Sequence, residues 1–267
     1  MNADKSETKQ TENTNEKLPW QSIPRWALPI LIILTGVVIF FIAQYAASFL
    51  MSLYASIRGW DYQQANSWLT NSVTAQFFFV LFFETIVIGL LYGIFKHYHR
   101  SLATIGLKRP RLVDGAYGLV AYPVYLIIYL AVLAISIHFF PSLNVNQSQN
   151  IGFNSVHGTY QLVLTFFSLV ILPPIAEELL FRGFLFEGLK KSMPVIYAAI
   201  ITSVIFAAAH LPEGSSGPFW VGALDVFTLS LVLVYLKQKT KTLWPGIVLH
   251  ALKNMVAFVS LFLLTNR

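Results

Sequence analysis

The feature that most constrains the fold is a series of seven long apolar segments, each close to the ~20 residues that cross a bilayer core. Of the 267 residues, 56% are hydrophobic and only 11% are charged, and the mean hydropathy is +0.63. A soluble domain carries about 25% charged residues. The sequence therefore predicts an all-α fold, a polytopic transmembrane helical bundle of about seven spans. The predicted spans are 27–50, 76–95, 115–139, 160–188, 193–211, 219–236 and 243–264.

The chain before and between the first spans is polar. Residues 1–19 lack apolar periodicity, so we expect a disordered cytoplasmic tail. A cleaved signal peptide is not expected, because this stretch carries acids and the following apolar run is longer than a signal h-region. Residues 20–100 should hold the N-terminal transmembrane helices, with the mixed segment 51–75 forming a helix along the membrane interface.

Basic residues alternate from loop to loop. They occur in the N-terminal tail, in 96–113, after the fourth span and before the last, whereas 141–159 and 212–218 have no Lys or Arg and 51–75 has only Arg58. By the positive-inside rule, this pattern places the N-terminus in the cytoplasm and the C-terminus outside, in a multi-pass protein of the cell membrane. The net charge of +6 is then explained by topology and contact with the lipid bilayer, and no nucleic-acid partner is expected. The chain has no cysteine, which excludes disulfides and zinc sites built on thiolates.

The stretch "PPIAEELLFRGFLF", residues 173–186, places three charges inside the fourth span. Each charge at the centre of a membrane helix costs about 2.5–3.5 kcal/mol. Glu178 and Arg182 are four residues apart and share a helix face, so an ion pair would reduce that cost, either at a functional site or simply to hold helices together. Glu177 points about 100° away from Glu178 and has no local cation. The two prolines at 173–174 should break or kink the helix just before the glutamates.

Two further spans carry polar residues at helical spacing. "FAAAH" places Phe206 and His210 on one face, and "HALKN" does the same for His250 and Asn254. A lone membrane histidine is more often a packing residue, but two of them with an amide and an unpaired Glu177 favour function. Glu and His together can deprotonate water, and His and Asn can donate hydrogen bonds to an oxyanion.

Helix lengths raise a difficulty for this grouping. His250 should lie about 10 Å from the inner end of its helix, and His210 about 25 Å from the inner end of its own. Straight helices would keep the two apart, so we expect a tilted or deeper fifth helix, or different boundaries. Other polar residues receive simpler interpretations: Glu84 is expected to make a structural hydrogen bond or lie at the interface, and Asp225 to support the site or face a wet cavity.

The three motifs EExxxR, FxxxH and HxxxN, with "LWP" ahead of the last, occur in this order between residues 177 and 254. In order and spacing they resemble the CPBP family of intramembrane proteases, which groups type II CAAX prenyl proteases with bacteriocin-processing and self-immunity proteins. The resemblance covers roughly residues 100–262 and makes 101–267 a CPBP-like protease core. Two departures are Ser230, where a glycine is expected, and Lys253 beside the motif asparagine.

The resemblance implies an endopeptidase that cleaves a membrane-associated protein or peptide. It makes Glu177 the general base for water, with His210 helping to activate it. It makes His250 and Asn254 the groups that polarise the scissile carbonyl, and it makes Glu178 and Arg182 shape the site. No metal is favoured, because there is no HExxH and Glu/His activation of water accounts better for the asparagine. If zinc is used, Glu177, His210 and His250 are its expected ligands.

Two other classes of function remain open. A proton-coupled transporter also places Glu and His in the membrane, but it would spread polar groups along a path and often shows an internal repeat. A non-catalytic immunity or binding protein would be expected to lose motif residues, and all six are present: Glu177, Glu178, Arg182, His210, His250 and Asn254.

Overall fold

The computed structural model describes residues 24–154, 156–215 and 217–264, so the predicted tail at 1–19 lies outside the described residues. Seven of its helices are long and apolar enough to cross a membrane, which confirms the all-α, seven-span prediction. Within the described residues the only β pairing is a single bridge between Gln149 and Gly214. The helices are α1 (Ala27–Ile57), α2 (Tyr62–Asn71), α3 (Val73–His97), α4 (Leu112–Phe139), α5 (Gly158–Phe166), α6 (Leu172–Glu177), α7 (Glu187–Leu189), α8 (Val195–His210), α9 (Trp220–Thr240) and α10 (Trp244–Phe258).

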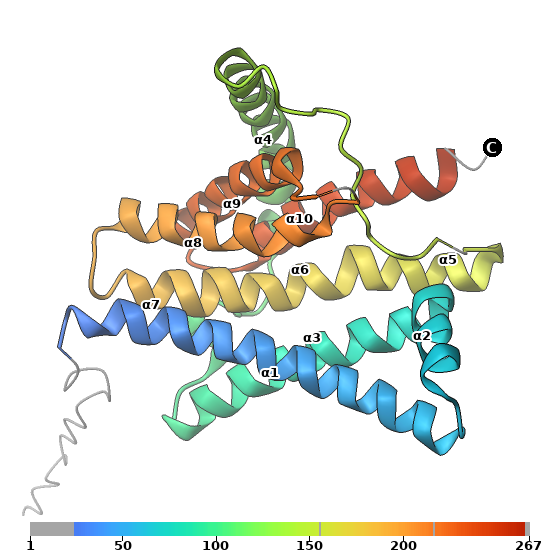
Figure 1. Cartoon of the computed structure of the whole chain (residues 1–267). Helices are drawn as coiled ribbons and strands as arrows, with labels where there is room; N and C mark the ends of the chain where they lie inside the picture. Colours follow the sequence, from blue (N-terminus) through green and yellow to red (C-terminus); the bar gives the residue numbers. More distant parts are fainter. Residues whose placement is uncertain (1–23, 155, 216, 265–267) are drawn as a thin grey trace, which may run out of the picture.

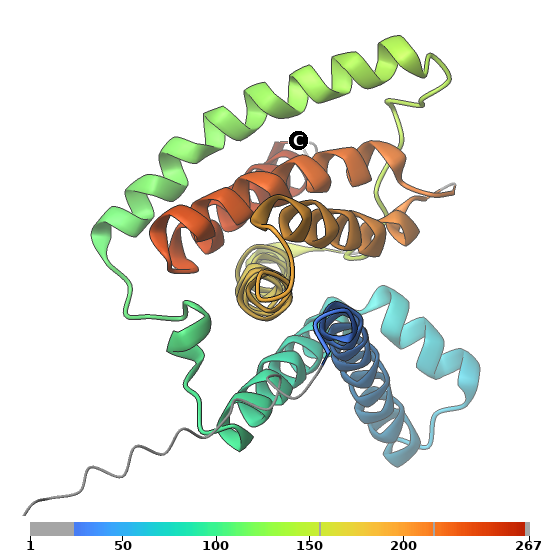
Figure 2. The ribbon, with the colours of Figure 1, turned by 90° about the vertical axis from the view of Figure 1, so that its left-hand side faces the viewer.

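The fourth span, α5 to α7, lies between two groups of helices (Figures 1 and 2). On one side α1 packs against α3, and on the other α8, α9 and α10 pack together. Helix α4 lies on the far side of α9 and α10, where Figure 2 shows it as the outermost helix of that group. Of the seven spans, α9 is the most buried and α4 the least. The fourth span therefore has protein on two sides, which allows it to carry charges.

The segment 51–75, predicted to form one interfacial helix, is divided among α1, α2 and the start of α3. Residues up to Ile57 extend α1, because the apolar run continues past the predicted end of the span. A separate helix, α2, follows it. Asp61 is the N-cap residue of α2 and forms a capping box with Gln64. The Asp61 carboxylate accepts a hydrogen bond from the Gln64 backbone N–H, and the Gln64 side-chain oxygen accepts one from the Asp61 backbone N–H.

The two prolines do not break the fourth span. The helix runs from Gly158 to Leu189 and adopts π-helical geometry at Phe167–Ile171 and again at Glu178–Phe186. Short π segments frequently mark functional sites. The first precedes Pro173, which can neither donate an N–H nor fit the α-helical ring, and the wider turn accommodates it. Of the predicted break or kink, the break is absent, and the helix changes type beside the prolines instead.

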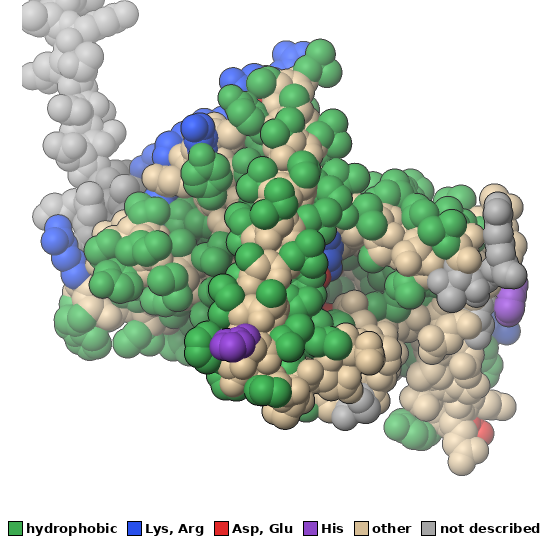
Figure 3. Space-filling view, turned by 90° about the horizontal axis from the view of Figure 1, so that it is seen from above, with side chains coloured by type: hydrophobic (Ala, Val, Ile, Leu, Met, Phe, Trp, Pro, Cys, Tyr) green, Lys and Arg blue, Asp and Glu red, His purple; other side chains and the backbone are tan. Residues whose placement is uncertain are grey.

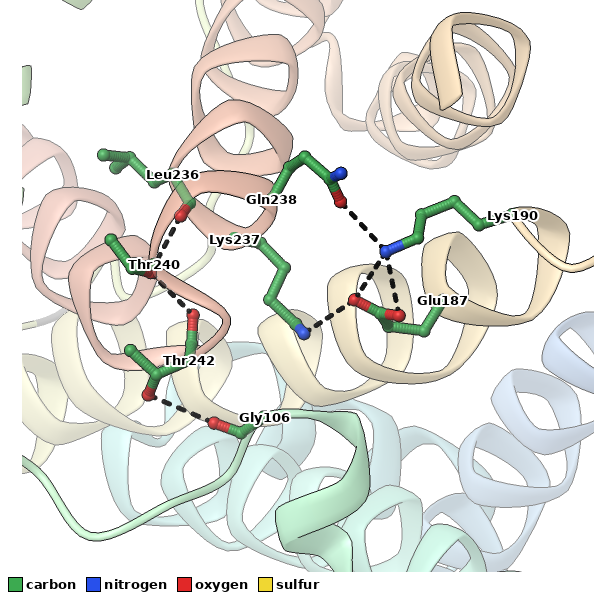
Figure 4. Close-up of polar contacts among 8 residues, drawn as sticks. All are labelled: Gly106, Glu187, Lys190, Leu236, Lys237, Gln238, Thr240 and Thr242. Atoms are coloured by element: carbon green, nitrogen blue, oxygen red, sulfur yellow. Dashed lines mark hydrogen bonds and ion pairs between the residues drawn. The ribbon is translucent and has the colours of Figure 1, made fainter. Parts of the chain in front are cut away.

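A polar cluster joins three segments at the end of the bundle where α7 and α9 meet (Figure 4). Lys190 and Lys237 both donate to Glu187, at 3.0 and 2.8 Å, and only 4% of the Lys237 side chain is exposed. Beside them, the Thr242 hydroxyl donates to the Gly106 carbonyl at 3.2 Å. These contacts tie the fourth span and α9 to the loop that precedes α4.

The surface seen from above is mostly apolar, and most of the Lys and Arg side chains visible there gather toward the upper and left edges (Figure 3). Many large apolar side chains on the spans are exposed; those of α4 include Leu119, Val120, Ile127 and Leu130. In water such a surface would promote association, whereas in a bilayer it is the surface that lipid covers. The protein is an integral multi-pass membrane protein.

Candidate active site

The centre of the site is a buried ion pair. Nη1 of Arg182 donates to Oε1 of Glu178 at 2.9 Å, and both side chains are fully buried. The guanidinium carbon lies 4.3 Å from the centroid of the Phe206 ring, a cation–π contact. Gly246 leaves room for the pair, because a Cβ at that position would lie 2.8 Å from Oε2 of Glu178. The expected pairing of Glu178 with Arg182 is therefore present, held between α8 and α10.

The side chain of Glu177 points away from the Glu178–Arg182 pair. About a quarter of its side chain is exposed (24%), yet Oε2 is buried and makes no hydrogen bond within the described residues. Nε2 of His250 lies 3.7 Å from this oxygen. The other ring nitrogen of His250, Nδ1, lies 3.4 Å from Oε1 of Glu178. The His250 ring therefore sits between the two carboxylates, and Glu177 keeps an oxygen available to accept a proton.

His210 ends helix α8 and faces the same space. Its Nδ1 lies 2.8 Å from the Phe206 carbonyl, which can only accept, so Nδ1 carries the hydrogen. In the neutral ring this leaves a lone pair on Nε2 that can accept a hydrogen bond from water. The ring of Phe206 contacts both histidines, with centroids 4.7 Å from His210 and 6.0 Å from His250. Phe206 thus fixes the spacing between them.

Asn254 contacts the fourth span. Its Nδ2 donates to the backbone carbonyl of Leu169 at 2.9 Å. The amide group has two N–H donors, so one is used here and one remains. The asparagine and Leu169 both line the cavity described next.

Glu177, His210, His250 and Asn254 line one cavity of about 360 Å³. Glu178 and Arg182 lie behind its wall, fully buried. The structure thus brings all six sequence-predicted residues to one place. The helices that carry His210 and His250 begin within two residues of their predicted positions, so different boundaries are not what brings the two histidines to one cavity.

Sequence reasoning missed the pairing on the far wall of the cavity. Nζ of Lys253 lies 3.2 Å from Oδ2 of Asp225, and the hydroxyl of Tyr125 makes a short hydrogen bond to Oδ1. Asp225 and Lys253 are each conspicuous in the sequence, but they lie on different helices and no local spacing links them. Glu213 adds another carboxylate to the cavity, where it accepts from the Gln149 amide at 2.6 Å. The cavity is therefore polar on several sides.

A zinc ion bound by protein side chains needs three or four of them converging at about 2.0–2.2 Å from one point. Among the residues that the structure describes, no group of three or more His, Asp or Glu side chains is arranged to hold a metal ion. Glu177, His210 and His250, as they lie, do not fit that requirement.

Comparison with known proteins finds a family similarity over the part of the chain that carries the site. Residues 159–256 match the family model described as type II CAAX prenyl endopeptidase, Rce1-like. This segment is therefore similar to the Rce1-like endopeptidases. It begins in α5 and ends in α10, so it contains all six site residues and excludes the first three spans.

The uncharacterized protein YyaK of Bacillus subtilis (strain 168) is 32% identical to the chain over 100 residues. The matched region is 35% of this chain and 32% of that protein, so the chain spans about a third of the length of this relative. No solved structure matches the chain significantly. Similarity therefore supports an Rce1-like segment at 159–256, and what the whole chain does rests on its own site.

Proposed function

We propose that the chain is an intramembrane endopeptidase that hydrolyses a peptide bond of a membrane-associated protein or peptide. The observation that carries this proposal is the buried Oε2 of Glu177, which has no hydrogen-bond partner in the described residues and faces a cavity that two histidines share. A carboxylate without a cation in the membrane is costly, so an arrangement that keeps one beside His250 favours a chemical role. The similarity to Rce1-like endopeptidases over the segment that contains it supports the same class of reaction.

In the proposed reaction, Glu177 accepts a proton from a water molecule that the free Nε2 of His210 also holds. The resulting hydroxide attacks the scissile carbonyl carbon, and negative charge develops on the carbonyl oxygen. His250 and the second N–H of Asn254 stabilise that oxyanion by donating hydrogen bonds. The C–N bond then breaks, and the proton held by Glu177 passes to the leaving amine, which gives one new carboxyl terminus and one new amino terminus.

Glu178 and Arg182 have a different role in this proposal. Arg182 holds Glu178 in place, and Glu178 lies 3.4 Å from Nδ1 of His250. A carboxylate at this position favours a hydrogen on Nδ1 and orients the ring, so the proposed donation from Nε2 to the oxyanion requires the doubly protonated ring, in which both nitrogens carry a hydrogen. The pair thus shapes the site and does not touch the substrate.

We also propose that the protein lies in the cell membrane with its N-terminus in the cytoplasm, as the distribution of Lys and Arg indicates. The proposed cleavage serves CAAX processing, peptide maturation or bacteriocin self-immunity; the family model that matches residues 159–256 is described as a type II CAAX prenyl endopeptidase. A non-catalytic immunity or binding role and proton-coupled transport remain the competing proposals. Each predicts that no peptide bond is cut.

The proposal is tested by comparing the membrane peptidomes of cells that carry the wild type, Glu177→Gln or Asp61→Asn. Asp61→Asn is a matched acid-to-amide control, since Asp61 is an exposed carboxyl at the N-terminus of α2, outside the segment 159–256, and asparagine caps a helix equally well. We expect a set of new peptide termini with the wild type and with Asp61→Asn, and accumulation of the uncut precursors with Glu177→Gln. If wild type and Glu177→Gln give the same termini, the protein is not this protease.

The metal-free form of the mechanism has its own test. We propose that purified, active protein contains less than one zinc per chain and keeps its activity after chelation and dialysis. The measurements are elemental analysis and cleavage before and after treatment with a chelator. Stoichiometric zinc that is lost together with activity, and that restores activity when added back, would make Glu177, His210 and His250 metal ligands.

A further inference from the structure

The Leu169 carbonyl is left without a backbone donor by the sequence that follows it. In an α-helix it would accept from the nitrogen four residues later, which is Pro173, and in a π-helix from the nitrogen five residues later, which is Pro174. Neither proline has an N–H. The next earlier nitrogen, that of Leu172, donates to Phe167. No regular helical pattern can therefore supply this carbonyl.

The donor comes from another span. Nδ2 of Asn254 in α10 reaches the Leu169 oxygen at 2.9 Å. An unpaired carbonyl in a membrane-spanning helix is costly, and the Asn254 amide supplies the donor that the helix itself lacks. Because that oxygen can only accept, the contact also fixes which end of the amide faces the fourth span.

This contact joins the same two helices that carry the proposed catalytic pair. The Leu169 carbonyl is about two turns before Glu177 in the fourth span, and Asn254 is one turn after His250 in α10. A bond between the Asn254 side chain and the Leu169 carbonyl therefore holds together the two helices across which His250 approaches Glu177 to 3.7 Å.

We propose that Asn254 is a positioning residue that ties α10 to the interruption made by the two prolines, and so sets the distance between Glu177 and His250. The effect of this contact on cleavage rests on the proposed function. The hydrogen bond between Asn254 and the Leu169 carbonyl, called the tie below, does not. One N–H of the Asn254 amide donates to the Leu169 carbonyl. The fixed orientation of the amide leaves the other N–H free to donate to the substrate carbonyl. The two prolines leave the Leu169 carbonyl without a backbone donor, and Asn254 on the other span supplies one.

The experiment restores the missing donor by another route. Four full-length proteins are purified in detergent: wild type, Asn254→Ala, Pro173→Ala, and the double variant. The Pro173→Ala change supplies an N–H four residues after Leu169, so it can occupy the carbonyl that Asn254 leaves. We expect Asn254→Ala to lower the melting temperature, and Pro173→Ala to recover most of that loss in the double variant.

Two matched controls separate the tie from general effects. Asn150→Ala removes another asparagine of the same cavity, and its effect on melting should not depend on residue 173. Pro123→Ala removes the proline inside α4, and it should not rescue Asn254→Ala. If Asn254→Ala leaves the melting temperature unchanged, or lowers it by the same amount with and without the Pro173→Ala change, the tie does not exist. If Asn254→Ala cannot be purified, a double variant that purifies and melts like Pro173→Ala supports the tie, and one that also fails overturns it.

Cleavage measured on the same proteins distinguishes this inference from the proposed function. The double variant should regain stability and remain inactive, because the N–H for the substrate is still missing. Recovery of cleavage together with stability would support the tie even more strongly, and would remove Asn254 from the oxyanion site. Absence of cleavage in the wild type would end the proposed function and leave the melting result intact.

Discussion

At the scale of single residues, the ion pair of Glu178 and Arg182 carries most of the electrostatic cost of the site. Both side chains are fully buried, and three of their polar atoms, Oε2 of Glu178 and Nε and Nη2 of Arg182, have no hydrogen-bond partner within the described residues. Breaking a buried pair by removing one partner costs about 3–5 kcal/mol, whereas replacing both can be nearly neutral. The pair is thus stable only as a unit.

Size-matched substitutions test this coupling. Glu178→Gln and Arg182→Met should each lower the melting temperature in detergent, because each leaves one buried charge unpaired. The double variant should recover part of the loss, while cleavage stays reduced because His250 has lost its oriented neighbour. The measurement is a double-mutant cycle on thermal melting. A double variant as unstable as the sum of the two singles would show that these residues do not stabilise each other.

The six candidate residues were chosen from sequence, and the structure brings them together, but their contacts between helices could not be predicted. Helical spacing alone placed Glu178 beside Arg182, and the structure confirms that pairing. The contact of Asn254 with Leu169 depends on two helices far apart in the chain, so no local spacing reveals it. The available signal was the consecutive proline pair, which identifies a carbonyl that needs an outside donor.

At the scale of helices, apolar length predicted the spans well and helix type poorly. The last two predicted spans, 219–236 and 243–264, begin within one residue of α9 and α10. The first was predicted to end at residue 50 but continues to Ile57, since apolar side chains persist there. The π-helical stretches around Glu177 were not predicted, because hydropathy is insensitive to a change of one residue per turn.

The junction of the fourth span with α9 depends on Glu187. Lys237 is almost completely buried and donates to Glu187, whereas Lys190 is partly exposed and also contacts Gln238. Glu187→Gln removes the only carboxylate near Lys237 in the described cluster, so it should cost more than Lys190→Ala. Hydrogen bonds to charged groups contribute about 1.5–3 kcal/mol, and exposed pairs about 0–1 kcal/mol.

Thermal melting of the two variants, beside wild type, checks this order. Glu187→Gln should melt clearly lower than Lys190→Ala, and Lys237→Met with Glu187→Gln should recover part of the loss. Equal melting temperatures for Glu187→Gln and Lys190→Ala would contradict the assignment of Glu187 as the partner that Lys237 requires.

At the scale of the whole molecule, the orientation in the membrane follows from loop charge and is directly measurable. The chain has no cysteine, so single cysteines can be labelled without background. Thr104 lies in a loop predicted to be cytoplasmic and Ser142 in one predicted to be external, and both are exposed. In intact cells, an impermeant thiol reagent should label Ser142→Cys and not Thr104→Cys, until the membrane is opened. The reverse pattern would invert the proposed topology.

The central claim is that Glu177 makes this membrane protein a protease. The most direct measurement incubates purified wild type and purified Glu177→Gln with a precursor identified from the peptidome comparison, and follows the two new termini by mass spectrometry. The amide is nearly the same size as the carboxylate and cannot accept the proton of water, so the variant should melt close to wild type and show no cleavage. Cleavage at the wild-type rate by a folded Glu177→Gln protein would contradict the account.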